Sequence, residues 1–212
     1  MRALNGWQFT PAWREISKMP VLLPGSPRDE PMLFGADLEF ARRNGGLITN
    51  TFLTMIGAGR RDLIVDSKVV MLMAGMWPCI PGWHHDDVDR GPDGQPDYDF
   101  ATNNPIHYMM HVGGGQSNTE FIAEPVLVPK PPAGSKVYRV WDNYLNALAP
   151  RSEFVSPGSI VQFDSRTFHR GSRAKGAGWR FWIRASEGSN RKPVNEIRKQ
   201  VQVYMDDPSE GW

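Results

Sequence analysis

The chain has 212 residues, and its 24 basic and 23 acidic side chains leave a formal net charge of +1. Such a balanced charge disfavours a protein that depends on nucleic acid as its partner, and no run of 18 apolar residues predicts a membrane span. Cys79 is the only cysteine, which excludes an internal disulfide and favours a reducing, cytoplasmic location. The N-terminus has no apolar run typical of a signal peptide.

The N-terminal part of the chain is rich in proline and predicts little regular structure at first. Residues 1–35 combine tryptophans with several prolines, and we expect an irregular arm packed on the main body. Asp37 can cap a helix that runs to about Arg43, and the glycines at 45 and 46 end it. Residues 47–56 are apolar and fit either a helix or a strand.

The middle of the chain begins with a near-continuous apolar stretch. Residues 63–76 fit a buried strand, and the prolines in 77–82 bend the chain after it. Residues 89–104 form a polar loop rich in Gly, Pro and Asp. Because this loop follows a cluster of possible metal ligands, we expect it to overhang them as a lid or a substrate-selecting loop.

Further short apolar segments follow, separated by turn residues. We expect strands over 105–112, 119–128, 159–164 and 179–186, and an amphipathic helix over 137–148. With 21 glycines and 18 prolines, many turns are implied, which favours short strands over long helices. The sequence therefore predicts an all-β roll with a few flanking helices.

A single domain is expected to cover residues 1–212, since a β-roll of this length is ordinary. We divide it into an N-terminal arm and helix (1–60), a β core (63–186) and a C-terminal segment (190–212). Within the last segment, residues 193–204 have apolar positions spaced three and four apart and predict a helix or an extended arm. A contact in a homodimer is a further alternative for this segment.

A candidate metal site begins with His84 and Asp86. On an extended strand, side chains two positions apart point to the same side, about 6–7 Å apart at Cα, so both can reach one cation. His169 can supply a third ligand. Two imidazoles and one carboxylate that leave the opposite positions open are the arrangement of non-heme Fe(II) oxygenases.

The spacing alone leaves the register of this pair open. His85 and Asp87 form a second His-x-Asp pair that faces the other side of the strand. His107 and His111 are four apart, but on a strand they lie about 13 Å apart, too far for one metal ion. We interpret these two histidines mainly as ordinary strand residues, with contact of one of them to co-substrate or substrate as the alternative.

A basic residue after the last histidine suggests a second ligand. Arg180 lies 11 positions beyond His169 on a predicted strand, and its planar guanidinium can hold a carboxylate through paired hydrogen bonds. Arg184 shares its face and competes for this role. A metal site beside such a group points to a dicarboxylate co-substrate that chelates the metal.

These motifs carry a family resemblance. Trp83-His84-x-Asp86, the segment 118–122, and the segment 157–171 followed by Arg180 resemble the Fe(II)/2-oxoglutarate-dependent oxygenases, in their phytanoyl-CoA hydroxylase-like branch. The resemblance covers about residues 65–186. It sharpens the predicted fold to a double-stranded β-helix, the cupin-like jelly roll, with the metal in its mouth.

The resemblance also implies a function. His84, Asp86 and His169 are expected to hold Fe(II), and Arg180, with Asn118 and Thr119 nearby, to bind 2-oxoglutarate. With O2, such an enzyme hydroxylates a substrate, here a small molecule or an amino-acid-like compound, and releases succinate and CO2. Halogenases of the family have a small residue in place of the carboxylate, so Asp86 favours hydroxylation.

Two other functions remain compatible with the sequence. One is a cupin-like metalloenzyme that does not use 2-oxoglutarate, for which Arg180 would have little importance. The other is a jelly-roll binding protein without catalysis, which would have no strong affinity for metal. The sequence does not identify the substrate.

Overall fold

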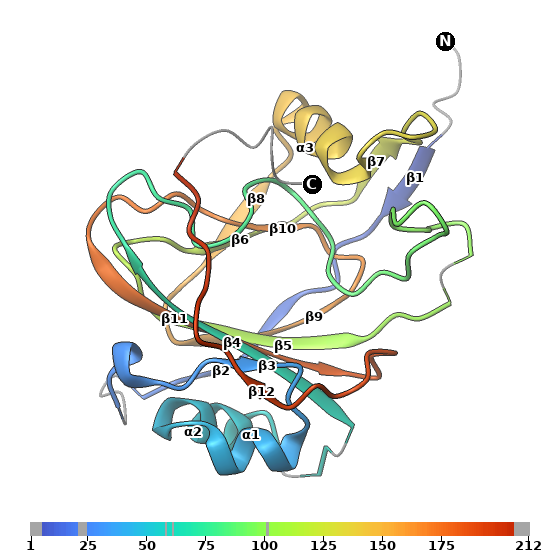
Figure 1. The fold of residues 1–212 in the computed structure, drawn as a ribbon. Helices are drawn as coiled ribbons and strands as arrows, with labels where there is room; N and C mark the ends of the chain where they lie inside the picture. Colours follow the sequence, from blue (N-terminus) through green and yellow to red (C-terminus); the bar gives the residue numbers. More distant parts are fainter. Residues whose placement is uncertain (1–5, 21–24, 58, 61, 101, 206–212) are drawn as a thin grey trace.

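The computed structural model describes residues 6–20, 25–57, 59–60, 62–100 and 102–205, and it consists mainly of β-strands (Figure 1). The strands are β1 (Gly6–Phe9), β2 (Arg14–Lys18), β3 (Leu33–Phe34), β4 (Leu63–Leu72), β5 (Ile106–Gly113), β6 (Thr119–Ile122), β7 (Val126–Pro129), β8 (Ser152–Val155), β9 (Ser159–Asp164), β10 (His169–Gly171), β11 (Gly178–Glu187) and β12 (Glu196–Ile197). The helices are α1 (Leu38–Asn44), α2 (Leu47–Met55), α3 (Val137–Leu148) and a short 3-10 turn (Pro27–Asp29). None of the described helices is long and apolar enough to cross a membrane.

Two antiparallel sheets face each other and form the core. The larger has the strand order β2-β9-β5-β11-β4, and the smaller has the order β10-β6-β8. His84 extends the smaller sheet, because it forms an isolated antiparallel bridge with His169 at the start of β10. Between β4 and β11 the chain crosses repeatedly from one sheet to the other, with β6 and β8 both in the smaller sheet, which is the connectivity of a jelly roll. The predicted fold class, an all-β jelly-roll core with a few flanking helices, is confirmed.

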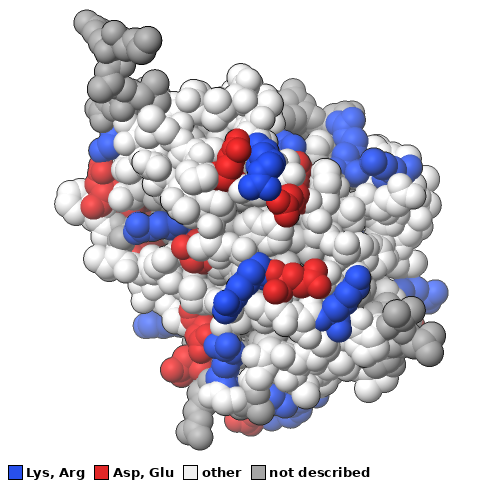
Figure 2. Space-filling model, turned by 180° about the vertical axis from the view of Figure 1, so that it is seen from behind, with Lys and Arg blue, Asp and Glu red and all other residues white. Residues whose placement is uncertain are grey.

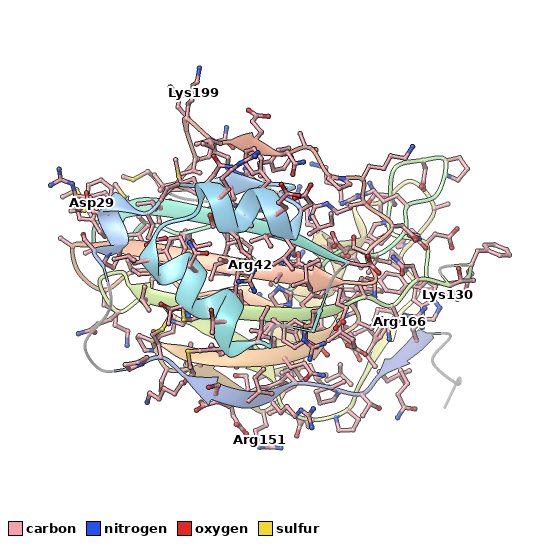
Figure 3. All side chains as sticks on the ribbon, turned by 90° about the horizontal axis from the view of Figure 1, so that it is seen from below. Asp29, Arg42, Lys130, Arg151, Arg166 and Lys199 are labelled. Carbon is pink, nitrogen blue, oxygen red and sulfur yellow. The ribbon has the colours of Figure 1, made fainter. Side chains whose placement is uncertain are left out.

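Helices α1 and α2 cover the outer face of the larger sheet, as Figure 3 shows from below. The buried apolar side chains between them include Phe52, Val65 and Phe181. Asp37 caps α1 as predicted, since its carboxylate accepts the backbone N–H of Phe40 at 2.8 Å. The segment 47–56, for which the sequence allowed helix or strand, contains helix α2.

The buried carboxylate of Glu30 caps the start of α2. It accepts the backbone N–H groups of Ile48 and Thr49 at 2.7 and 3.1 Å. These donors have no partner within the helix, and a negative charge at a helix N-terminus is favourable. The 3-10 turn and its neighbours are thereby fixed against the helical layer.

The N-terminal segment is more regular than the sequence indicated. Residues 1–35 contain strands that pair with later parts of the chain. Strand β1 pairs with β7, and β2 extends the edge of the larger sheet beside β9. The prediction of an irregular arm is therefore wrong for these strands, while residues 1–5 and 21–24 lie outside the described residues. The described prolines of this segment lie between the strands, where no ladder hydrogen bond is needed.

The C-terminal segment is extended, so the helical alternative for 193–204 is wrong. Strand β12 pairs with β3, and Tyr204 forms a bridge with Trp77. Val194 and Ile197, which suggested a buried helical stripe, are 53% and 46% exposed. The segment instead crosses in front of the two sheets in Figure 1, from the larger sheet toward the loop around Trp77.

Two other predicted elements need correction. The expected strand over 119–128 is two strands, β6 and β7, which belong to different sheets. The described residues of the loop 89–104 are not among those that line the main cavity. Tyr98 anchors it in an aromatic cluster with Trp7 and Trp141, at ring distances of 5.7 and 5.0 Å.

Candidate metal and co-substrate site

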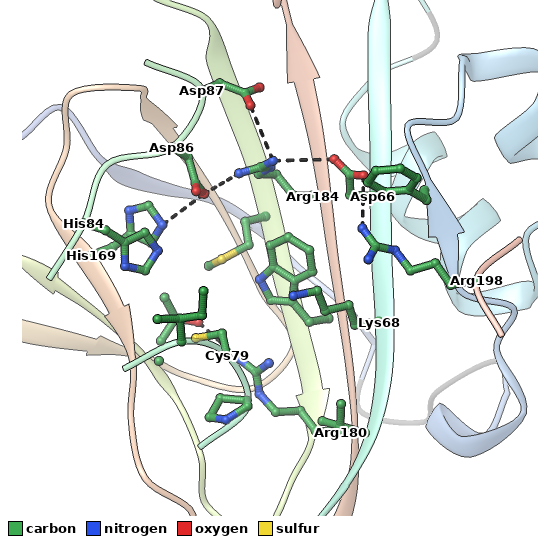
Figure 4. Close-up of a pocket in the computed structure, with 18 of the residues that line it drawn as sticks. Asp66, Lys68, Cys79, His84, Asp86, Asp87, His169, Arg180, Arg184 and Arg198 are labelled. Carbon is green, nitrogen blue, oxygen red and sulfur yellow. Dashed lines mark hydrogen bonds and ion pairs between the residues drawn. The ribbon is translucent and has the colours of Figure 1, made fainter. Parts of the chain in front are cut away.

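A cavity of about 430 Å³ opens between the two sheets. Its walls come from the inward faces of β4, β5 and β11 on one side, and from the segments around His84 and His169 on the other (Figure 4). Residues Phe34, Arg191 and Arg198 border it from the N-terminal and C-terminal segments. Polar and charged groups are thus gathered between two apolar layers.

Three potential metal ligands converge at one side of this cavity. His84, Asp86 and His169 each offer a ligand atom, and these atoms all lie within 4.8 Å of one another. The backbones of the two histidines are held side by side, since each N–H donates to the carbonyl of the other at 3.1 Å. Gly82, with φ at +111°, turns the chain just before His84, a conformation that favours glycine.

The orientation of the imidazole rings is fixed by backbone carbonyls. His84 Nδ1 donates to the carbonyl of Gly82 at 2.9 Å, and His169 Nδ1 donates to the carbonyl of Thr167 at 3.0 Å. This selects the tautomer in which Nε2 carries a lone pair, as in metal-binding histidines. Burial, with His169 close by, lowers the pKa of His84 to about 4, so its ring is neutral at pH 7. Both rings therefore suit a divalent metal.

Asp86 faces the same point as an ionised carboxylate. Its Oδ2 lies 3.1 Å from His169 Nε2 and forms an ion pair with Arg184. Burial alone would raise the pKa of Asp86, but the guanidinium of Arg184 holds it well below its usual range. A carboxylate that stays charged in a partly buried position is a suitable third ligand. The chemistry of the three groups fits Fe(II).

The alternative pair, His85 and Asp87, does not join this cluster. The ring of His85 lies 3.9 Å from that of Phe168, and its Nδ1 lies 2.7 Å from the hydroxyl of Tyr98. Asp87 lies close to the guanidinium groups of Arg184 and Arg191. Among the described residues, the group found to suit a metal is the one that contains His84 and Asp86.

Arg180 lines the cavity below the three ligands. Its side chain is buried, with Nε donating to the carbonyl of Ser117 and Nη2 to Thr119 Oγ1, each at 3.3 Å. Within the part of the chain that the structure describes, no carboxylate forms an ion pair with it. Burial lowers the pKa of Arg180 to about 10, so the guanidinium remains charged at pH 7. A buried cation in this state favours binding of an external anion.

Thr119 and Asn118 differ in their position relative to the cavity. Thr119 lines it and contacts Arg180. Asn118 is absent from the lining residues. Its backbone N–H donates to Ser172 Oγ at 2.8 Å, and its side-chain oxygen lies 3.4 Å from His111 Nε2. Asn118 therefore supports the turn before β6 rather than the cavity wall.

Arg184, the competitor of Arg180, is already surrounded by carboxylates. It forms ion pairs with Asp86 and Asp66, and lies 3.9 Å from Asp87. Although burial works in the opposite direction, these carboxylates raise the pKa of Arg184 above its usual value. Its charge is thus used to hold a candidate metal ligand in place.

Two charged residues of the cavity were not singled out from the sequence. Asp66 and Lys68 lie on the inward face of β4, opposite Arg184 and Trp182 of β11. The sequence does contain an indication of their role, because these two charged residues, two positions apart, interrupt the apolar stretch 63–76. Arg191 and Arg198 reach the cavity from the C-terminal segment, and nothing in the local sequence indicated this.

The predicted substrate loop borders a different, smaller cavity of about 330 Å³. Asp89, Arg90 and Asn103 line it together with His85 and Tyr138. The described loop residues that line it are not among those that line the larger cavity, although Asp87 and Arg191 border both. The expectation that 89–104 overhangs the metal site is therefore wrong for the described residues.

Comparisons with known proteins give few matches. No family model matches the sequence, and no curated protein matches it. Among solved structures, "CytC3 with Fe(II) and alpha-ketoglutarate" is 16% identical with a TM-score of 0.33, and the match covers 61% of this chain. The chain spans only 45% of the length of CytC3. AviO1 from Streptomyces viridochromogenes Tue57 is 16% identical with a TM-score of 0.37, covering 91% of this chain and 77% of AviO1.

Proposed function

We propose that this protein is an Fe(II)- and 2-oxoglutarate-dependent oxygenase that hydroxylates a small molecule. The observation that carries the proposal is the joint presence, in one cavity, of the three convergent ligands and of Arg180, a buried cation without a carboxylate partner among the described residues. A metal site alone is compatible with many enzymes. A metal site beside an available guanidinium specifies a ligand with two anionic ends.

His84, Asp86 and His169 would hold Fe(II), and Arg180 with Thr119 would hold the distal carboxylate of 2-oxoglutarate. The bound metal, with this co-substrate and O2, would supply the oxidising chemistry. The chain itself orients the ligands through Gly82, Thr167 and Arg184, as described above. Apolar side chains, among them Met109 and Ile80, also line the cavity.

The surface supports a small substrate rather than nucleic acid. On the face shown in Figure 2, basic and acidic side chains are interspersed and form no continuous basic field. A cavity of about 430 Å³ is within the range of small-molecule sites. A small molecule is therefore the proposed partner, and the lone cysteine keeps a reducing compartment as the proposed location.

The proposal is tested by anaerobic titration of metal-free protein with Fe(II) and 2-oxoglutarate. We expect a weak visible charge-transfer band, which reports a keto acid chelated to iron. The band should be absent from His84→Ala and retained in His85→Ala. Tight iron binding without the band would favour a metalloenzyme that does not use 2-oxoglutarate, and failure to bind iron would overturn the enzyme proposal.

A further inference from the structure

The charges that line the main cavity do not balance. Among the described residues, five basic side chains and three carboxylates border it, an excess of two positive charges before any metal is bound. Uncompensated charge is costly in a buried place, because the protein interior solvates it poorly. The basic residues that have no carboxylate partner therefore indicate what kind of ligand the cavity binds.

Three of the basic residues are neutralised within the protein. Arg184 pairs with Asp86 and Asp66, while Arg191 binds Asp66 through two contacts of 2.6 and 3.2 Å. Arg198 also approaches Asp66, at 3.7 Å. Together with Asp87, which lies close to Arg184 and Arg191, these residues form a network of three arginines and three aspartates.

Lys68 and Arg180 remain outside this network. Neither forms an ion pair with any carboxylate in the described ranges, and both point into the cavity in Figure 4. Under the proposed function, Arg180 is used by the distal carboxylate of 2-oxoglutarate, and the other carboxylate of that molecule lies at the metal. Lys68 then still lacks a counter-charge.

Lys68 and Arg180 belong to neighbouring cross-strand pairs on the same face of the sheet, and each such pair is called a row below. Lys68 pairs across the strands with Trp182, whereas Arg180 pairs with Val70 and Arg184 with Asp66. Rows on the same face of a sheet are about 6–7 Å apart, so Lys68 lies between the co-substrate clamp and the metal-side network. Its ammonium lies 5.9 Å from the centre of the Trp182 ring.

The surroundings of Lys68 favour an incoming anion. Burial lowers its pKa, and Arg198 and Arg184 act in the same direction, while Cys79 and Asp86 act against them. An anion beside the ammonium would remove this unfavourable environment. Trp182 and Met109 provide apolar surface next to it, which suits the carbon skeleton of an organic acid.

We propose that Lys68 binds a carboxylate of the primary substrate, so that the substrate class is a small organic acid. This inference rests on the proposed function, because it assigns Arg180 to 2-oxoglutarate. It separates two anion subsites in one cavity: one for the co-substrate at Arg180 and one for the substrate at Lys68. A neutral analogue of the substrate should bind poorly.

The first experiment asks whether Lys68 belongs to the co-substrate site. The affinity for 2-oxoglutarate is measured from the charge-transfer band in wild type, Lys68→Met, Arg180→Met and the control Lys192→Met, which alters an exposed lysine. We expect Arg180→Met to weaken binding at least about tenfold, as for loss of a charged hydrogen bond, and Lys68→Met to change it little. An equal loss in Lys68→Met would assign this lysine to 2-oxoglutarate and overturn the inference.

The second experiment probes the substrate subsite directly with trifluoroacetate. The protein is loaded with Mn(II) and saturated with 2-oxoglutarate, and the paramagnetic relaxation of the 19F signal is compared with that of the neutral trifluoroacetamide. We expect enhanced relaxation for the anion only, lost in Lys68→Met, retained in Lys192→Met and restored in part by Lys68→Arg. Thermal unfolding of each variant verifies that it is folded.

The two failures are distinguishable. Wild-type protein that binds iron but develops no charge-transfer band would overturn the proposed function. A normal band combined with trifluoroacetate relaxation that is the same in wild type and Lys68→Met would overturn only the assignment of Lys68.

Discussion

Arg180 and Arg184 lie on the same face of β11, two positions apart, but their guanidinium groups have opposite surroundings. Arg184 contacts three carboxylates, one of which is the candidate metal ligand Asp86. Within the described residues, the guanidinium of Arg180 donates hydrogen bonds to one carbonyl and one hydroxyl and pairs with no carboxylate. The first arrangement stabilises the protein itself, whereas the second is suited to bind an external anion.

This difference predicts different effects of matched substitutions. Arg184→Met should lower the free energy of unfolding by about 3–5 kcal/mol, because it leaves buried carboxylates without their counter-charge. Arg180→Met should leave the stability of the ligand-free protein unchanged or raised, because it removes a buried, unpaired charge. Urea unfolding of both variants measures this. A larger loss in Arg180→Met than in Arg184→Met would contradict the assignment of their roles.

The glycine turn beside Arg180 allows a test that leaves all charges intact. A Cβ at Gly114 would lie 2.7 Å from Arg180 Cβ and Cγ, at a backbone φ of +96°. Gly114→Ala should therefore displace Arg180 and weaken 2-oxoglutarate binding about tenfold, with metal affinity retained. The control is Gly134→Ala, which has a similar φ of +78° but open space around it. Equal 2-oxoglutarate affinity in the two variants would argue against a role for Arg180.

The register of the metal ligands can be tested with phenylalanine in place of each neighbouring histidine. His85 is surrounded by the rings of Phe9, Phe168 and Trp141, so His85→Phe should fold and bind metal. Its stability should change by no more than about 2 kcal/mol, since one hydrogen bond to Tyr98 is lost. His84→Phe should abolish metal binding. Calorimetric titration with Mn(II) measures both, and the opposite pattern would move the site to His85 and Asp87.

His111 makes the stability of the fold dependent on pH. Burial and the nearby Arg180 lower its pKa to about 3, from an ordinary value near 6.5. Because the unfolded chain binds a proton more readily, the contribution of this residue to the free energy of unfolding is greatest above pH 6.5. It decreases progressively as the pH falls toward 3. The loss approaches about 1.4 kcal/mol per pH unit. The free energy of unfolding, measured with urea between pH 6.5 and 5, should depend less steeply on pH in His111→Gln than in wild type. An equal pH dependence in the two proteins would refute this role of His111.

The pairing of His84 with Asp86 could be predicted because it follows from a local rule, whereas the approach of His169 depends on its bridge to His84. The His-x-Asp spacing places His84 and Asp86 on one face of an extended segment, whatever the rest of the fold. The choice between the two possible registers could not be derived from spacing. It depends on which face of the segment meets the aromatic cluster around His85, and this is a tertiary property.

The remaining charges of the cavity depend on strand pairing, which local sequence does not specify. The roles of Asp66 and Lys68 depend on the residues opposite them on β11, which lie more than a hundred positions later in the chain. Arg198 lies in the segment 193–204, whose apolar spacing suggested a helix or an extended arm, and pairing of β12 with β3 keeps it extended. Arg191 precedes this segment. The loop 89–104 was placed wrongly for a similar reason, since burial of Tyr98 holds it away from the cavity.

The central claim is that one cavity holds both the metal and the co-substrate in the way described. A crystal structure of the protein with Mn(II) and 2-oxoglutarate, prepared without oxygen, tests it most directly. We predict Mn(II) bound by His84, Asp86 and His169, the distal carboxylate of 2-oxoglutarate against Arg180 and Thr119, and the ammonium of Lys68 not in contact with 2-oxoglutarate. Metal bound at His85 and Asp87, or 2-oxoglutarate held by Lys68 instead of Arg180, would contradict this account.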